Sequence, residues 1–139
     1  MFRSLATLLL AALATTAVHA QDLTKSPEGA KVTITEPANG AEVSSPVTVK
    51  FAISGMDLAP AGSDKPNTGH HHLLIDQTLS DPKATIPADD HHKHFGKAQT
   101  EAKFELAPGK HALQLVLGDA NHLPFDPPVQ SEVITITVK

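Results

Sequence analysis

Short alternations of apolar and polar residues run along most of this chain, and they predict β-strands rather than helices. The clearest alternation covers residues 47–54, where Val, Phe or Ile occupies every second position. Because side chains point to opposite faces along a strand, this pattern buries one face and leaves the other polar. Six more strands are predicted, the weakest of them lying between Pro82 and Pro87. They cover residues 31–35, 70–76, 84–86, 101–106, 111–117 and 133–139.

The predicted strands are short and separated by turns, which is typical of two packed sheets. Asn39-Gly40 and Pro108-Gly109 are turn pairs, and no amphipathic helix longer than two turns is visible. About seven strands in this arrangement predict an all-β fold, an immunoglobulin-like antiparallel β-sandwich. A small open barrel is the alternative. The sequence shows no internal repeat and no second domain, so we expect one domain over residues 31–139.

The first twenty residues have the pattern of a secretion signal. Arg3 is followed by an apolar run from Leu5 to Leu13, and small residues at Val18 and Ala20 form a cleavage site. The apolar run is short for a membrane span. We therefore expect a signal peptide at residues 1–20, cleaved after Ala20, and a flexible leader at residues 21–30. The mature chain would be periplasmic or secreted and not an integral membrane protein, with a retained anchor as the alternative.

Composition narrows the classes of partner. Without Arg3, ten basic residues stand against fifteen acidic ones, a net charge of −5, which argues against nucleic acid and anionic membranes. The chain has no Cys, so disulfides, a thiolate nucleophile and a sulfur-rich metal site are excluded. Trp and Tyr are also absent, which argues against sugar binding on aromatic rings.

Three groups of histidines stand out, at residues 70–72, 91–94 and 122. In a seven-strand Greek-key sandwich, successive strands run in opposite directions and alternate loops emerge at the same end, so all three groups map to one pole. This mapping requires the weak strand at residues 84–86. Residues two apart on a strand share a face at roughly 6.5 Å, so each His-x-His pair can hold one ion. The candidate metal ligands are His70, His72, His92, His94 and His122.

The remaining histidines are expected to have other roles. His71 should point into the core, partly buried and hydrogen-bonded, since it alternates with its two neighbours. His91 and His111 are interpreted as solvated side chains, with His111 beside the opposite turn. Asp89, Asp90 and Asp119 serve either as loop-capping residues or as groups around the ligands.

The ligand type restricts the metal. Neutral imidazole suits Zn, Cu(II) and Ni. Met56 is the only Met of the expected mature chain, which disfavours a thioether site for Cu(I). We therefore expect a divalent transition metal ion, Cu(II) or Zn, held by an exported buffer, carrier or sensor.

Several spaced motifs resemble a bacterial family catalogued as a domain of unknown function, number 4399. The resemblance covers about Asn67 to Lys139, with a further match at residues 55–62. It implies an exported, freestanding β domain and no established activity. Family members tend to have His where this chain has Phe125, and Gly at Lys97 and Ala98. The matching motifs are Asn67 to Asp76, His92 to Glu101, Pro108 to Leu115, Gly118 to Pro124 and Pro127 to Glu132.

Two other functions fit the same residues. In a metal-dependent enzyme, the histidines would leave one coordination position open, and Asp89, Asp90 or Glu101 would act as general base. In an envelope interaction module without metal, eight protonated histidines would change the net charge from −5 to +3 in mild acid.

Overall fold

The computed structural model describes residues 12, 14 and 22–139 of the chain. The predicted signal peptide and its cleavage site therefore lie outside the described residues, apart from those two positions. Within the described part, no helix is long and apolar enough to cross a membrane.

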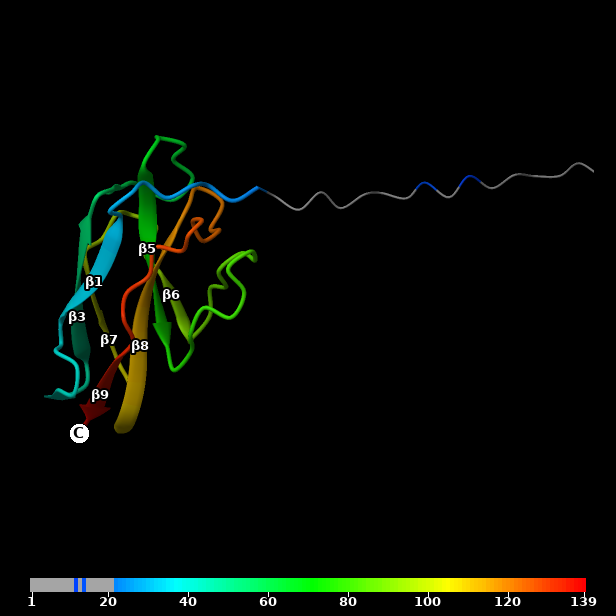
Figure 1. Cartoon of the computed structure of the whole chain (residues 1–139). Helices are drawn as coiled ribbons and strands as arrows, with labels where there is room; N and C mark the ends of the chain where they lie inside the picture. The colour runs from blue at the N-terminus through cyan, green and yellow to red at the C-terminus, as the bar shows by residue number, and fades with distance from the viewer. Residues whose placement is uncertain (1–11, 13, 15–21) are drawn as a thin grey trace, which may run out of the picture.

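The described chain forms two β-sheets that pack face to face, which confirms the predicted all-β sandwich (Figure 1). The smaller sheet has the order β1-β3-β7, and the larger has the order β2-β9-β8-β5-β4, with β6 paired to β5. The strands are β1 (Lys31–Glu36), β2 (Glu42–Val43), β3 (Val47–Ser54), β4 (Asp57–Leu58), β5 (Thr68–Ile75), β6 (His92–His94), β7 (Glu101–Phe104), β8 (Gly109–Gly118) and β9 (Ile134–Val138).

The core lies between the sheets and follows the alternation in the sequence. Val47, Val49 and Phe51 of β3 are buried, while Thr48 and Ala52 on its other face are exposed. The leucines of β8 and the isoleucines of β9 oppose them from the larger sheet. Each fully buried side chain of this size contributes roughly 1.5–3 kcal/mol, so this layer holds the sheets together.

Strand β5 occupies the middle of the larger sheet and is buried along its whole length. It pairs with β8 on one side and with β4 and β6 on the other. Its inner face carries Leu73 and Ile75 into the main core. On its outer face, Leu74 forms a second apolar cluster with Ile86 and Val116. A strand with both faces covered can bury polar side chains deeply, and this one carries three histidines.

The predicted strand at residues 84–86 is wrong, because this segment is a loop between Pro82 and Pro87. Its Ile86 instead anchors the loop in the second apolar cluster. The strand at this edge of β5 is formed by the histidine segment itself, as β6. The histidines meet without that strand, and not through three loops at one pole as predicted. His70 and His72 lie in β5 and His94 in β6, so the groups meet on the outer face of the larger sheet.

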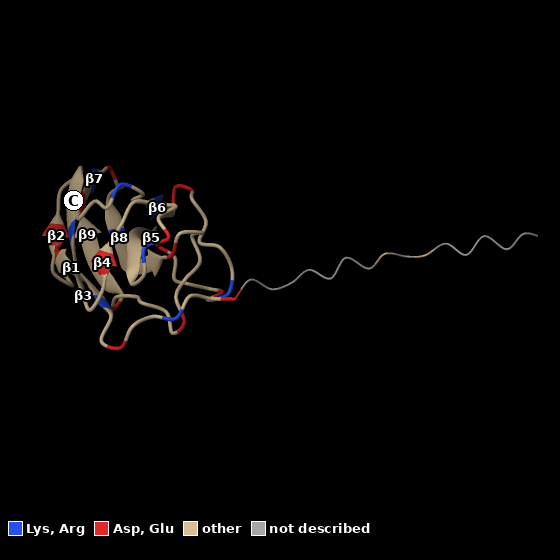
Figure 2. Cartoon of the chain, turned by 90° about the horizontal axis from the view of Figure 1, so that it is seen from above, with Lys and Arg blue, Asp and Glu red and all other residues tan. Residues whose placement is uncertain are grey.

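The segment expected to be a flexible leader is attached to the domain. Thr24 to Ser26 run beside Asp126, where Asp126 N–H donates to the Thr24 carbonyl at 2.9 Å and Ser26 N–H donates to the Asp126 carbonyl at 3.1 Å. In Figure 1 this blue segment passes beside the orange loop that follows β8. Acidic and basic residues are interspersed over the loops and strand ends rather than separated by sign (Figure 2).

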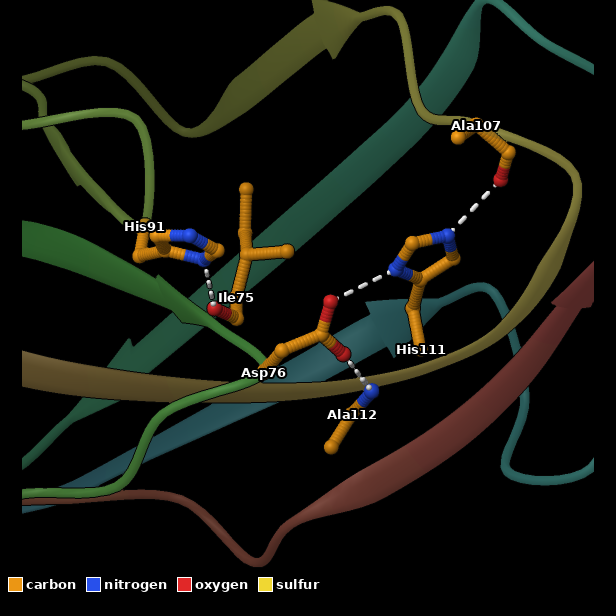
Figure 3. Close-up of polar contacts among 6 residues, drawn as sticks. All are labelled: Ile75, Asp76, His91, Ala107, His111 and Ala112. Carbon is orange, nitrogen blue, oxygen red and sulfur yellow. Dashed lines mark hydrogen bonds and ion pairs between the residues drawn. The ribbon is translucent and has the colours of Figure 1, made fainter.

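A polar clamp joins the end of β5 to the start of β8, at the end of the sheet away from His70 (Figure 3). The Asp76 carboxylate accepts hydrogen bonds from His111 Nδ1 at 2.7 Å and from the Ala112 N–H at 2.9 Å. His111 Nε2 donates to the Ala107 carbonyl at 2.7 Å. Both ring nitrogens thus face acceptors, which favours the charged imidazolium. His111 was expected to be solvated, and instead it has two hydrogen-bond partners. His91, which was also expected to be solvated, is exposed, and its Nδ1 donates to the Ile75 carbonyl.

These contacts shift both pKa values. The Ala107 carbonyl, followed by Asp76, raises the pKa of His111 above 6.5 although partial burial opposes it. Burial would raise the pKa of Asp76, but the bonds from His111 and Ala112 lower it overall, below 3.8. The stabilisation from His111 is fully present below pH 6.5 and is lost as the pH rises through its folded-state pKa.

We expect His111→Phe, which keeps a ring and removes both donors, to lose about 1–2 kcal/mol of unfolding free energy near pH 6. The loss should be smaller near pH 9, where the wild-type imidazole is neutral. Urea unfolding at both pH values measures the difference. An equal loss at both would mean that the charge of the imidazolium adds nothing to stability.

Candidate metal centre

Four histidines from three segments converge on the outer face of the larger sheet. His70 and His72 point outward from β5, and the strand register places His94 of β6 directly opposite His72. On the other side, His70 pairs with Gly118, after which the chain turns and returns with His122. One possible ligand atom from each of the four rings lies within 4.8 Å of all the others.

The rings meet closely enough to share an ion. Their centroids are separated by 4.7 Å (His70 and His72) to 5.8 Å (His72 and His122). His70 Nε2 and His122 Nδ1 are 3.0 Å apart. A tetrahedral ion with metal–nitrogen bonds of about 2.0–2.1 Å requires nitrogens about 3.3 Å apart. The possible ligand atoms of the four rings, all within 4.8 Å of one another, lie near this spacing.

Two glycines make room for the rings. A Cβ on Gly118 would lie 2.5 Å from Cε1 of His72, and a Cβ on Gly96 would lie 2.5 Å from Cε1 of His94. Any larger residue would thus push a ring away from its present position. The backbone is shaped around the imidazoles at both points.

His122 is held by contacts of its loop rather than by strand pairing. Its backbone is in the left-handed region, with φ 62°, and its N–H donates to the Asp119 carbonyl at 3.0 Å. The buried Asp119 carboxylate accepts from the N–H groups of Asn121 and Leu123, on either side of the histidine. Ile86 N–H donates to the His122 carbonyl at 2.8 Å. These bonds aim the ring at the cluster.

Burial keeps three of the four histidines, His70, His72 and His94, in the uncharged form that binds metals. Desolvation, with additional repulsion from neighbouring histidines, lowers the pKa of His70 to about 4 and that of His72 to about 3. Desolvation followed by the charge of His122 also lowers the pKa of His94. At neutral pH these imidazoles are uncharged and have a free lone pair.

One side of the cluster is buried and the other is open to solvent. His70 and His72 are each 1% exposed, whereas His122 is half-buried and His94 is exposed. An ion can therefore reach the site past His94 and His122, while the rings of His70 and His72 are shielded from water.

The structure does not bring His92 into this cluster, although it was a candidate ligand. His92 pairs with Leu74 of β5, two residues from His72. Its side chain is therefore on the same face of the sheet as the cluster, but next to an apolar residue. Its Nδ1 bonds the Asp89 carboxylate at 2.7 Å, and this bond, more than any other effect, lowers the pKa of Asp89. Asp89 also accepts from the His91 N–H, so it caps its own loop. Glu101 belongs to β7 in the other sheet.

Sequence reasoning missed the contribution of the glycines and of Thr24. A glycine does lie close to two of the histidine segments, Gly96 shortly after His94 and Gly118 shortly before His122, so that signal was present. Thr24 donates its hydroxyl to the Asp119 carboxylate at 2.9 Å from 95 residues away. No local pattern in the sequence predicts this contact.

Comparison with known proteins identifies the family of the chain. The profile of the family described as "Domain of unknown function (DUF4399)" matches residues 49–139, which include all five candidate ligands. No curated protein matches the chain. Among solved structures, the fibronectin(III)-like modules of Clostridium thermocellum CbhA match with a TM-score of 0.39 and 13% identity, over 77% of this chain and 92% of that chain.

His71 differs from its neighbours because it points into the core between the sheets. Its ring lies 5.1 Å from that of Phe51, and it is 1% exposed. Neither ring nitrogen has a hydrogen-bond partner among the described residues, whereas a hydrogen bond and partial burial were expected. Desolvation lowers its pKa to about 4. An unpaired buried polar group costs about 1–3 kcal/mol, so His71 is less favourable in the core than an apolar residue of similar volume.

We expect His71→Leu to stabilise the metal-free protein by about 1 kcal/mol at neutral pH, because Leu has a similar volume and no polar atoms. The advantage should grow by up to about 1.4 kcal/mol per pH unit between 6.5 and about 4, where only the unfolded wild-type chain binds the proton at this position. Urea unfolding in the presence of a chelator measures both effects. A variant that is less stable than wild type at every pH would show that the ring has a stabilising role.

Proposed function

We propose that this chain, which belongs to the DUF4399 family, is an exported metal-binding protein that holds Cu(II) or Zn as a buffer, carrier or sensor. The observation that supports this proposal is the convergence of His70, His72, His94 and His122, with possible ligand atoms within 4.8 Å of one another. The buried rings of His70 and His72 are costly to desolvate without an ion, and coordination offsets that cost.

The ligand set supports a borderline divalent ion. All four donors are imidazole nitrogens, a set that suits Zn and Cu(II). Met56, the single Met of the expected mature chain, is buried in the main core. A tetrahedral arrangement of the four rings favours Zn and a flattened one favours Cu(II), so the proposal keeps both ions.

Binding is favoured over catalysis. Four protein ligands fill the tetrahedral sphere of Zn, whereas catalytic sites keep a position open for water or substrate. Two of the carboxylates considered as general bases are engaged or remote, since Asp89 caps its loop and Glu101 lies in the other sheet. The geometry therefore supports storage or transfer of an ion more than turnover of a substrate.

A pH switch based on this cluster is also less favoured. The pKa values of His70 and His72, about 4 and about 3, leave both rings neutral between about pH 5 and 7. They would not contribute to the reversal of charge that an envelope interaction module would need in mild acid. Metal binding instead requires imidazoles that are neutral at this pH.

We expect the purified chain to bind one Zn or Cu(II) ion with a Kd below roughly 10 μM, measured by calorimetry. His94→Ala should weaken binding at least tenfold because it removes a ligand. His92→Ala, the same change two residues away on β6, should leave the affinity unchanged. Wild-type protein without a saturable site, or equal losses in the two variants, would contradict the proposal.

We also expect Gly118→Ala to weaken metal binding tenfold or more, because the new methyl group would displace the His72 ring. Gly118 has no positive φ that Ala would have to adopt. Circular dichroism and urea unfolding provide the control for folding, and calorimetry provides the affinity. Wild-type affinity in a folded variant would show that the position of the His72 ring is not critical.

A further inference from the structure

We infer that Thr24–Ser26 form a strap that holds His122 in the cluster, so that the metal site is complete only while this strap is docked. The inference rests on the proposed function, because His122 has to be a ligand for the strap to control the ion. It concerns regulation of that site, by a segment that the sequence placed in a flexible leader.

The strap is docked through backbone and side-chain bonds to the loop that follows His122. Thr24 and Ser26 exchange two backbone hydrogen bonds with Asp126, at 2.9 and 3.1 Å. The Lys25 ammonium pairs with the Asp126 carboxylate. Ser26 Oγ donates to the Pro127 carbonyl at 2.9 Å. This part of the leader thus forms one strand-like contact with the loop.

A single buried carboxylate connects the strap to His122. Thr24 Oγ1 donates to Oδ2 of Asp119 at 2.9 Å. The other oxygen of the same carboxylate, Oδ1, accepts the N–H groups of Asn121 and Leu123 at 2.8 and 3.0 Å. These two residues flank His122 directly. By orienting the Asp119 carboxylate, Thr24 therefore also fixes the backbone on both sides of His122.

The other three ligands do not depend on the strap. His70 and His72 are fixed by the pairing of β5 with β8, and His94 by the pairing of β6 with β5. His122 lies on a loop, with a strained backbone and an additional bond from Ile86. Release of the strap would loosen the fourth ligand and leave three ligands on paired strands.

This arrangement provides a route for controlled release of the ion. A site with four imidazoles holds an ion more tightly than one with three, which leaves a coordination position open for an incoming ligand. Displacement of residues 24–26 would lower the affinity without unfolding the sandwich, because none of the strands includes this segment.

The experiment compares Zn affinity in four variants of the full domain. Thr24→Val removes the hydroxyl donor to Asp119, and Ser26→Pro removes the N–H that donates to the Asp126 carbonyl. Thr24→Ser keeps the hydroxyl, and Thr35→Val removes a comparable threonine bond, from β1 to the Lys50 carbonyl, away from the site. We expect roughly tenfold weaker binding for the first two, and wild-type affinity for the two controls.

The same strap variants in a His122→Ala background separate positioning from a general effect on the fold. We expect no additional loss of affinity there, because the ligand that the strap positions is absent. Amide exchange of residues 119–126 in metal-free protein should be faster in the strap variants, which shows release of the loop independently of metal.

The outcomes distinguish the two proposals. Wild-type protein that binds no Zn or Cu(II) overturns the proposed function and this inference with it. Wild-type protein that binds metal, with strap variants of equal affinity, overturns only the inference. Equal losses in the wild-type and His122→Ala backgrounds also overturn it, because the strap would then act on the whole fold.

Discussion

The candidate site depends on the pairing of β5 with β6 on one side and with β8 on the other. The register sets His72 opposite His94 on one side and His70 opposite Gly118 on the other. Since side chains alternate between the faces of a strand, a shift of one residue would turn His70 and His72 into the core and expose Leu73. The apolar residues of β5 and β8 that fill the core therefore also determine which histidines meet.

The histidines of β5 make opposite contributions on the two faces of the sheet. On the outer face, His70 and His72 join two other rings in a cluster that an ion can stabilise. On the inner face, His71 lacks a hydrogen-bond partner among the described residues and is costly to bury. The proposed metal binding would account for the burial of the outer pair. Nothing in the geometry accounts for His71, whose ring packs against Phe51.

Much of the fold was predictable because alternation of apolar and polar residues is a local signal, and residues 47–54 show it clearly. The direction of His70 and His72 away from His71 follows from the same alternation. The sequence was misleading where long-range packing decides, as at residues 84–86, where Ile86 packs as a loop residue. His92 has the expected spacing from His94, but the register places it beside Leu74. The contact between Thr24 and Asp119 spans 95 residues and has no local pattern.

X-ray absorption spectroscopy of the chain loaded with one equivalent of Zn tests the central claim most directly. Four imidazole nitrogens should appear at about 2.0–2.1 Å, with no sulfur scatterer. Spectra dominated by oxygen ligands, or identical in wild-type protein and in a His70→Ala/His72→Ala variant, would show that the ion binds elsewhere and that the convergence of these rings does not form a metal site.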